Sequence, residues 1–259
     1  MLIPNRKERI LELLAQKNAV SIQELVADLG VSESTLRRDL VALEEEGLLT
    51  RVHGGATTTK DIHKEQKMSQ KENVNQAAKV QVAEYASTLA QPDSQIYLDA
   101  GTATLELIRV LPNNLNIQLV TNGVDHALLA LKRGFDVTLL GGHIKKNTHA
   151  IADMTAYKQL EKFNFSLAFM GMNGLHENQG LTTTNMDEAL LKECAMNQSQ
   201  KIRILMDDTK IDQVYEFKVK APTQSIILLN NQAKTKYSSS IEKLNEIFDL
   251  HFVENETIK

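Results

Sequence analysis

Residues 32–39 read SESTLRRD and follow a glycine at position 30. Ser32 is a residue type that caps helix N-termini, and Gly30 can end a preceding helix in a tight turn. In the helix that begins after Ser32, leucines recur at steps of four and three residues and predict one buried face: Leu36, Leu40 and Leu43. The opposite face then exposes two arginines, Arg37 and Arg38.

The neighbouring residues predict a helix-turn-helix with a wing. Upstream, Ser21 to Glu24 form a capping box that begins the middle helix, and a first helix is predicted to end before Gln16. Downstream, residues 48–56 read LLTRVHGGA, which alternates as a strand and turns at two glycines. A helix that exposes arginines near its start can lie in the major groove of DNA, and a bare wing glycine can approach a phosphate closely.

Together, SESTLRRD and LLTRVHGGA resemble the DNA-binding domain of the DeoR family of sugar-metabolism repressors. The resemblance implies that the third helix and the wing contact operator DNA. It maps these contacts onto Ser34, Thr35, Arg37, Arg38, Arg51, His53 and Gly54.

Other interpretations of the same residues remain open. Exposed arginine pairs are often a solvated helix face, which Glu33 or Asp39 can neutralise, and His53 can serve packing within the wing. The acidic run at 44–46 is expected to point away from phosphates. A module of this size can also mediate dimerisation or protein contacts. Because residues 1–60 are close to neutral, DNA binding depends on where the charges lie.

Length and composition indicate a globular protein of two domains. A chain of 259 residues with 42% hydrophobic residues exceeds one typical domain. Residues from about 57 to 75 are polar and lysine-rich, which suits an interdomain connector or an exposed helix. We predict a DNA-binding domain at 1–58, a linker at 59–75 and a second domain at 76–259. Charged residues interrupt the apolar positions near the start of the chain, so we expect no signal peptide, no membrane span and a cytoplasmic protein.

Cysteine and histidine usage gives no sign of a metal or a disulfide. Cys194 is the single cysteine, which excludes an intramolecular disulfide. The spacing of the histidines matches no zinc-type pair. We therefore expect neither a metal nor a cofactor.

The second domain alternates short apolar runs with helix-length segments. The runs lie at 96–98, 118–120, 137–140, 167–170, 202–205 and 226–229. This pattern predicts βα units around a largely parallel sheet. Ligands of such sheets bind beyond the carboxyl ends of the strands. Gly101, Thr102 and Thr104 follow the first run and open a helix, which suits a phosphate.

From about Lys79 to Leu229 the pattern resembles the DeoR-family sensor domain, a Rossmann-like α/β fold similar to ribose-5-phosphate isomerases and CoA-transferase-type proteins. The resemblance implies a phosphorylated sugar as the effector. The effector-site residues that it implies are Lys71, Lys79, Asp99, Gly101, Thr102, Thr104, Thr121, Asn122, Gly141, Gly142, Lys192, Asp207 and Lys210. The lysines are expected to balance the phosphate charge and to lie outside the core, where a lone lysine is rare.

Three positions depart from the family pattern. The family commonly has an arginine near Lys71, a threonine at Ala103 and a glycine at Ala152. A lysine offers a point charge where an arginine offers a planar fork. We therefore expect a reshaped pocket and an unusual ligand.

The combined prediction is a transcriptional repressor that binds double-stranded operator DNA as a homodimer or homotetramer and is released by a phosphorylated sugar. The resemblance favours repressors of lactose or fructose phosphotransferase systems. The alternative is a sugar-phosphate isomerase with a DNA-binding appendage, which needs a general base. Residues 171–174 hold no carboxylate, so Asp207 and Glu188 remain as possible bases.

Overall fold

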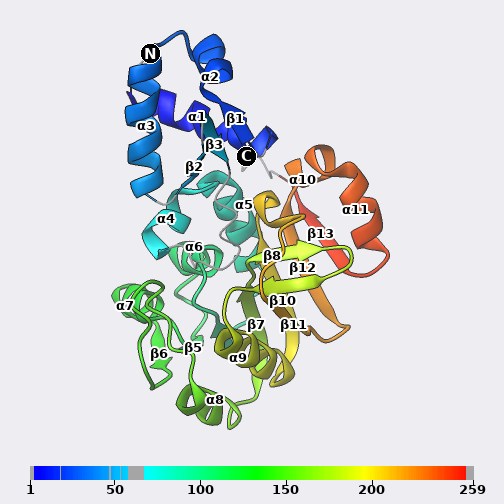
Figure 1. Cartoon of the computed structure of the whole chain (residues 1–259). Coiled ribbons are helices and arrows are strands. Elements are labelled where there is room, and N and C mark those ends of the chain that lie inside the picture. Colours follow the sequence, from blue (N-terminus) through cyan, green and yellow to red (C-terminus); the bar gives the residue numbers. More distant parts are fainter. Residues whose placement is uncertain (1–2, 18, 47, 53, 58–66, 255–259) are drawn as a thin grey trace. The chain divides into compact units, whose positions relative to one another are not determined.

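The computed structural model describes residues 3–17, 19–46, 48–52, 54–57 and 67–254 (Figure 1). Contacts between Cα atoms divide the chain into two compact units, Met1–Lys64 and Glu65–Lys259. Our domain limits of 1–58 and 76–259 stay a prediction. The range 59–75, which we interpret as a linker, contains a helix of the second unit, α4 (Met68–Asn73).

The first unit is a helix-turn-helix with a three-stranded sheet. Its elements are α1 (Ile3–Lys17), β1 (Ala19–Ser21), α2 (Ile22–Leu29), α3 (Glu33–Glu45), β2 (Thr50–Val52) and β3 (Gly55–Thr57). Strand β3 pairs antiparallel with both β1 and β2. The wing agrees with the sequence prediction, whereas β1 is absent from it, and α1 continues past the predicted end to Lys17.

Local sequence determines where α2 and α3 begin. The Ser21 hydroxyl accepts the N–H of Glu24 at 3.1 Å, and the Glu24 carboxylate accepts the N–H of Ser21 at 2.9 Å, which completes the predicted capping box. This backbone hydrogen bond, together with Lys17, lowers the pKa of Glu24 to about 2. Gly30 ends α2 at φ 65°, a left-handed conformation that favours glycine, and Ser32 caps α3 with its side chain.

One apolar cluster holds the three helices of the first unit together. Leu36, Leu40 and Leu43 are at most 1% exposed, as their spacing predicts. They share the cluster with Ile10 of α1 and Leu25 of α2, both fully buried. Burying side chains of this size contributes about 1.5–3 kcal/mol each. The arginine-bearing face of α3 is thereby turned away from the core.

The second unit is built on a seven-stranded parallel sheet. Its strands are β4 (Gln95–Leu98), β5 (Gln118–Thr121), β6 (Asp136–Leu139), β7 (Phe165–Gly171), β10 (Ser199–Met206), β12 (Ser225–Asn230) and β13 (Asp249–Val253). Their spatial order is β13-β12-β10-β7-β4-β5-β6, and each neighbouring pair is parallel. All six predicted apolar runs are strands of this sheet. Strand β13 was not anticipated by the sequence pattern.

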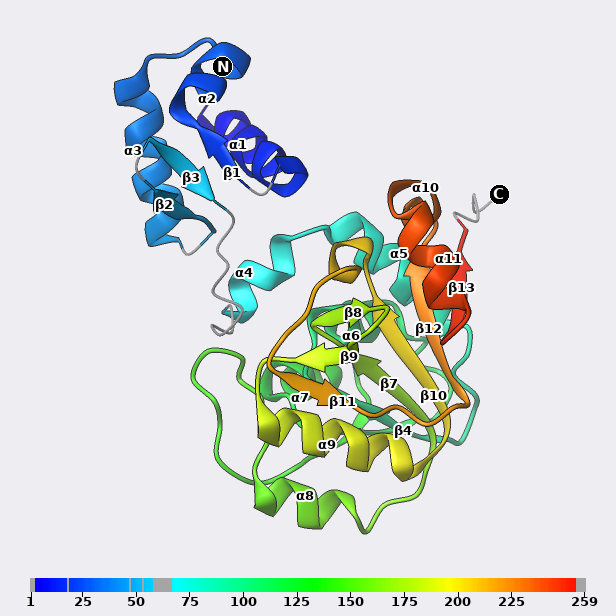
Figure 2. The same cartoon turned by 45° about the vertical axis from the view of Figure 1, so that its right-hand side comes forward.

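Helices and a small second sheet cover the main sheet. The helices are α5 (Gln76–Ser87), α6 (Thr102–Val110), α7 (Val124–Lys132), α8 (Met154–Leu160), α9 (Met186–Asn197), α10 (Gln232–Lys236) and α11 (Ser238–Asn245), with a 3-10 turn η1 at Asp208–Lys210. The second sheet is antiparallel and consists of β8 (Gly174–His176), β9 (Gly180–Thr183) and β11 (Phe217–Val219). Figure 2 shows α9 and this small sheet in front of β7 and β10.

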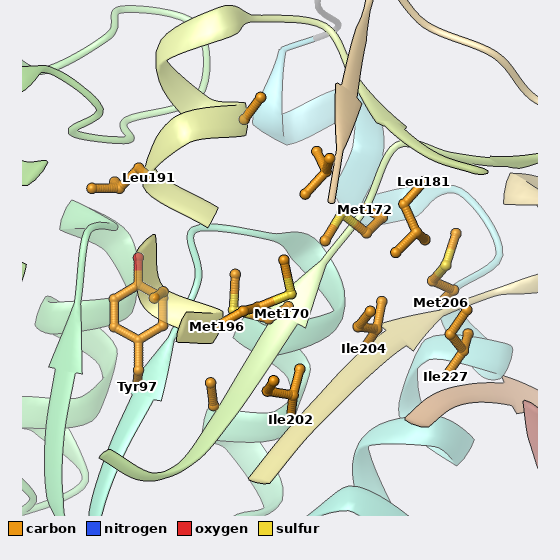
Figure 3. Close-up of a cluster of buried hydrophobic side chains, with 14 of the residues drawn as sticks. Tyr97, Met170, Met172, Leu181, Leu191, Met196, Ile202, Ile204, Met206 and Ile227 are labelled. Carbon is orange, nitrogen blue, oxygen red and sulfur yellow. The ribbon is translucent and has the colours of Figure 1, made fainter. Parts of the chain in front are cut away.

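Alternate residues of the strands fill two separate apolar clusters. On β4, Tyr97 belongs to one cluster, while Ile96 and Leu98 belong to the other. On β7, Met170 lies on the side of Tyr97, and Phe169 lies on the opposite side. Figure 3 shows the cluster that contains Tyr97, where Met170, Ile204 and Ile227 project from neighbouring strands. Because both faces of these strands are covered, most of their residues are apolar, although the first half of β10 carries Gln200 and Lys201, which are exposed.

The strand order creates a crevice at one point of the sheet. The chain runs from β4 outward through β5 to β6, and then returns to place β7 on the other side of β4. In open α/β sheets, ligands bind where the strand order reverses, beyond the carboxyl ends of the strands. In this sheet that point lies between β4 and β7.

None of the helices in the described ranges is long and apolar enough to cross a membrane.

Candidate functional site

The first turns of α3 expose the residues that we predict to contact DNA. Ser34, Arg37 and Arg38 are exposed, and Thr35 is partly exposed. The Ser32 hydroxyl lies 3.0 Å from that of Ser34 and 2.9 Å from that of Thr35, so the hydroxyls cluster at the helix start. Arg37 lies 3.4 Å from Glu33, one turn earlier, and both side chains are more than half exposed. Such a surface pair is weak, so Arg37 can exchange it for a phosphate or a base.

Asp39 has a different role from the neutralising one that we considered. It is 7% exposed and accepts hydrogen bonds from Nε and Nη2 of Arg6, the latter at 3.0 Å. This buried pair joins α1 to α3, over a separation of 33 residues in sequence. Asp39 is therefore engaged on the core side of α3, and the sequence pattern did not reveal its partner.

The wing places Arg51 and Gly54 at the surface. Both are exposed, and Gly54 has φ 86°, a conformation that favours glycine. The Glu44 carboxylate accepts the N–H of Arg51 at 2.8 Å and lies 3.7 Å from its guanidinium. Glu44, part of the acidic run that we expect to point away from phosphates, thus lies beside the wing. The predicted contact His53 lies outside the described residues.

A pocket opens beyond the carboxyl ends of β4, β7 and β10, which are neighbours in the sheet. Its empty volume, including the open mouth, is about 620 Å³. Seven of the predicted effector-site residues line it: Lys71, Asp99, Gly101, Thr102, Lys192, Asp207 and Lys210. They come from four separate parts of the chain, and the switch point of the sheet brings them together.

The N-terminus of α6 forms part of the pocket wall. Gly101 caps the helix, and Thr102 and Ala103 of its first turn also line the pocket. The N–H groups of a first helical turn lack partners within the helix, and the helix dipole adds positive potential there. A Cβ at Gly101 would lie 3.5 Å from the Cα of Gly171, so the backbones of the β4 and β7 loops approach each other closely.

A buried ion pair joins these two loops. Asp99 Oδ2 accepts the N–H of Gly171 at 3.1 Å and the ammonium group of Lys192. Lys192 Nζ also donates to the carbonyl oxygen of Gly171 at 2.9 Å. The two side chains are 6% and 8% exposed. Our expectation that Lys192 lies outside the core is wrong, since Lys192 is buried in the pocket wall. The protein can bury this charge because Asp99 balances it.

Thr104 and Asn122 do not line the pocket, but their side chains bind the backbone of the loop after β4. The Thr104 hydroxyl is fully buried and accepts the N–H of Gly101 at 3.1 Å. Asn122 Oδ1 accepts the N–H of Ala100 at 2.9 Å and the hydroxyl of Tyr97 at 3.1 Å. Both side chains therefore position the loop after β4.

His126, on α7, packs beneath the same loop. Its Nε2 lies 2.9 Å from the carbonyl oxygen of Gly101 and 3.1 Å from the Thr104 hydroxyl. Burial lowers the pKa of His126 to about 4, although the Gly101 carbonyl and Asp99 oppose this shift. The imidazole is therefore neutral at pH 7. A Cβ at Gly123 would lie only 2.4 Å from Nδ1 of His126, which explains a glycine there.

The remaining predicted effector residues lie outside the pocket lining. Thr121 is buried and accepts the N–H of Gly123 at 3.1 Å. Gly141 and Gly142 are exposed and follow β6, the edge strand of the sheet. Because β5 separates β6 from β4, the loop that begins at these glycines starts away from the switch point.

Lys79 is buried and holds α4 in place. It is 2% exposed, and its ammonium group donates to the carbonyl oxygens of Lys71 and, at 3.5 Å, of Glu72. Burial lowers the pKa of Lys79 to about 8, and Asp207 partly opposes this effect. Since Lys71 and Met68 of α4 line the pocket, Lys79 acts on the pocket through α4.

Sequence analysis missed several residues of the lining. Thr148, Asn173 and Glu188 also line the pocket. Glu188 was considered as a possible base, and Asn173 only as part of the loop at 171–174. Glu188 forms an ion pair with Lys145 at 2.7 Å. Thr148 and Asn173 are single polar residues in loops. Neither belongs to a sequence motif that predicts a ligand contact.

The other carboxylate considered as a base, Asp207, is also engaged. Its Oδ1 accepts the N–H of Thr209 at 3.0 Å and the side-chain amide of Asn75 at 3.2 Å. Within the described ranges, no three His, Cys, Asp or Glu side chains are grouped so as to hold a metal ion.

Sequence profiles of two domains match the chain: a DeoR-like helix-turn-helix domain over residues 6–61 and a DeoR C-terminal sensor domain over residues 74–230. The chain is 40% identical over 214 residues to an uncharacterized HTH-type transcriptional regulator of Bacillus subtilis, FruR, covering 83% of this chain and 85% of that protein. It is 31% identical over 210 residues to the lactose phosphotransferase system repressor of Staphylococcus aureus, covering 80% and 83%.

Solved structures with a similar fold include a ribose 5-phosphate isomerase from Methanocaldococcus jannaschii, with a TM-score of 0.41 and 17% identity. That match covers 54% of this chain and 56% of the isomerase chain. Another is eIF2B delta from Chaetomium thermophilum, with a TM-score of 0.42 and 14% identity, covering 57% and 56%. The chain thus spans little more than half of either structure.

Proposed function

Because the chain belongs to the DeoR family of transcriptional regulators, we propose that it represses a sugar-utilisation operon and that a phosphorylated sugar releases it from its operator. The relatives include a lactose phosphotransferase system repressor and a putative aga operon transcriptional repressor. A role in sugar metabolism is consistent with both. The chain is a regulator and not an enzyme.

The observation that supports the effector most strongly is the pocket at the switch point. Its wall contains the N-terminus of α6 and two lysines, Lys71 and Lys210. A helix N-terminus with nearby ammonium groups stabilises a bound phosphate. Lys192 adds no net charge, since Asp99 neutralises it. The phosphate is therefore assigned to the α6 side of the pocket, close to Gly101 and Thr102.

Helix α4 offers a route from the pocket to the DNA-binding unit. It is the first helix of the second unit in chain order, and Met68 and Lys71 of this helix line the pocket. A ligand that favours one position of α4 acts on the segment that leads to the first unit. For binding to lower DNA affinity, the ligand must prefer the DNA-incompetent arrangement, typically by about 1–3 kcal/mol.

We assign DNA contacts to the exposed residues of α3 and to the wing. A helix of this kind reads base edges with its first turns, and dimers of such proteins bind two-fold operators. A homodimer or homotetramer is therefore the proposed assembly. Ser34, Thr35, Arg37, Arg38, Arg51 and Gly54 are the described residues in this set.

An electrophoretic shift assay with DNA fragments from upstream of the protein's own operon tests the proposal. We expect one fragment to be retarded, and a phosphorylated sugar to release it. The free sugar should act at least tenfold more weakly, because it lacks a charge-assisted contact of about 1.5–3 kcal/mol. Failure to retard any fragment contradicts DNA repression, and release by free and phosphorylated sugar alike contradicts the phosphate site.

A further inference from the structure

We propose that Thr148 determines the specificity of the pocket by hydrogen-bonding a hydroxyl group of the ligand. This inference rests on the proposed function, because it concerns the ligand of the same pocket. It assigns the ligand two chemical features, a phosphate at the α6 side and a sugar hydroxyl that the Thr148 side chain contacts.

Thr148 has a buried hydroxyl that is left unused. Its residue is 6% exposed, it lines the pocket, and its Oγ1 has no hydrogen-bond partner among the residues that the structure describes. A hydroxyl removed from water without a new partner destabilises the folded protein. Native proteins retain few such groups, and each calls for an explanation, such as a water or a ligand that binds there. Among the three groups of this kind in the described residues, only that of Thr148 belongs to a residue of the pocket lining. A ligand hydroxyl in the pocket supplies the missing partner once the buried Thr148 hydroxyl turns toward the cavity.

The loop around Thr148 is held by its neighbours and not by Thr148 itself. The carbonyl oxygen of Asn147 accepts the N–H of Met68 at 2.9 Å, which joins the loop to α4. Lys145 forms an ion pair with Glu188 at 2.7 Å, which joins the loop to α9. These contacts hold the loop before a ligand binds, and a loop that is already ordered loses little entropy when the ligand arrives.

Asn173 provides a second polar group in the lining of the pocket. Its Oδ1 accepts the hydroxyl of Thr183 at 2.8 Å, which fixes the orientation of the amide. The NH2 group of Asn173 then faces away from Thr183 and is available as a donor. A sugar hydroxyl both donates and accepts hydrogen bonds, so it suits Thr148 and Asn173. An apolar ligand leaves Thr148 unpaired, and so does an inorganic phosphate that binds at the α6 side of the pocket.

The test compares Thr148→Val with Thr184→Val. Thr184 is the matched control, because its Oγ1 is also buried and without a partner in the described part of the chain, but it does not line the pocket. Calorimetric titration uses inorganic phosphate, fructose 1-phosphate, ribose 5-phosphate and the pair glucose 6-phosphate and 2-deoxyglucose 6-phosphate. We expect Thr148→Val to weaken the best sugar phosphate about tenfold and phosphate less than twofold. Thr148→Ser should restore most of the affinity, and Thr184→Val should leave it unchanged.

A second measurement does not depend on the ligand. If the Thr148 hydroxyl is reserved for a ligand, its removal should raise the melting temperature of the ligand-free protein, by about 2–4 °C. A lower melting temperature for Thr148→Val would show that the hydroxyl makes structural hydrogen bonds, and it would overturn the inference. Equal affinity of wild type and Thr148→Val for a sugar phosphate also overturns it, while the proposed phosphate site stands. If no sugar phosphate binds wild type, both the effector proposal and this inference fail.

Discussion

The second unit should lose stability when the pH falls from 7 to 5, because His126 is buried as a neutral imidazole. His126 is 1% exposed, and its ring packs against the Gly101 loop. Burial lowers its pKa from 6.5 to about 4. Between these two values the unfolded chain binds a proton at His126 and the folded chain does not. The stability that neutral His126 contributes is therefore complete above pH 6.5 and is lost as the pH falls toward 4.

The size of the effect follows from the two pKa values. A difference of one pKa unit corresponds to about 1.4 kcal/mol, so the full effect of His126 is about 3 kcal/mol. At pH 5 the unfolded state is almost fully protonated at this site and the folded state is not, which gives a loss of about 2 kcal/mol. Lys79 does not contribute in this range, because its pKa of about 8 leaves it charged at both pH values.

Urea unfolding followed by tyrosine fluorescence measures this effect in the full chain. All five tyrosines lie between residues 85 and 237, and the chain has no tryptophan, so the signal reports the second unit alone. His126→Gln keeps a donor for the Gly101 carbonyl but does not titrate. Its loss of stability between pH 7 and 5 should be about 2 kcal/mol smaller than that of wild type. His149→Gln, at a half-exposed site, is the control. Equal losses for wild type and His126→Gln would refute the reasoning.

Three further predictions concern the DNA surface and the pocket. Arg37→Ala and Arg38→Ala should each weaken operator binding. Loss of a base contact should cost about 1–3 kcal/mol of binding free energy. Loss of a phosphate contact should make the dependence of log affinity on log salt concentration less steep by about 0.9. Fluorescence anisotropy at several salt concentrations distinguishes a base contact from a phosphate contact. Operator affinity within twofold of wild type for both variants contradicts the assignment of DNA contacts to these two arginines. Gly101→Val should still bind DNA but not respond to the effector in the same assay, whereas a response equal to wild type argues against the α6 site. Lys192→Met leaves Asp99 buried without its cation and should lower the free energy of unfolding by about 3–5 kcal/mol. A loss below about 1 kcal/mol in urea would show that the pair matters little.

The sequence predicts the elements of this fold better than their arrangement. Five of the six apolar runs lie in strands that are largely buried, and a buried parallel strand is mostly apolar, which is a local property. The run in β6, at the edge of the sheet, is apolar although most of that strand is exposed. The pairing of β7 with β4 joins residues about 70 positions apart, and no local pattern encodes it. Strand β13 was missed because only its last residue, Val253, is fully buried. Strands β8, β9 and β11 have three or four residues each, too few for a period to be recognised.

The same limit applies to the pocket. Residues that touch a ligand and residues that hold those residues in place are alike in sequence, since both are polar and follow a strand. Gly101 and Thr104 are three positions apart, yet Gly101 lines the pocket while the hydroxyl of Thr104 faces inward to bind the Gly101 N–H. Thr148 is the opposite case, because it lines the pocket although no sequence motif contains it. It reaches the pocket because its loop returns from the edge strand β6 toward the centre of the sheet. The strand order decides which polar residues meet a ligand, and that order is the part of the fold that local sequence does not encode.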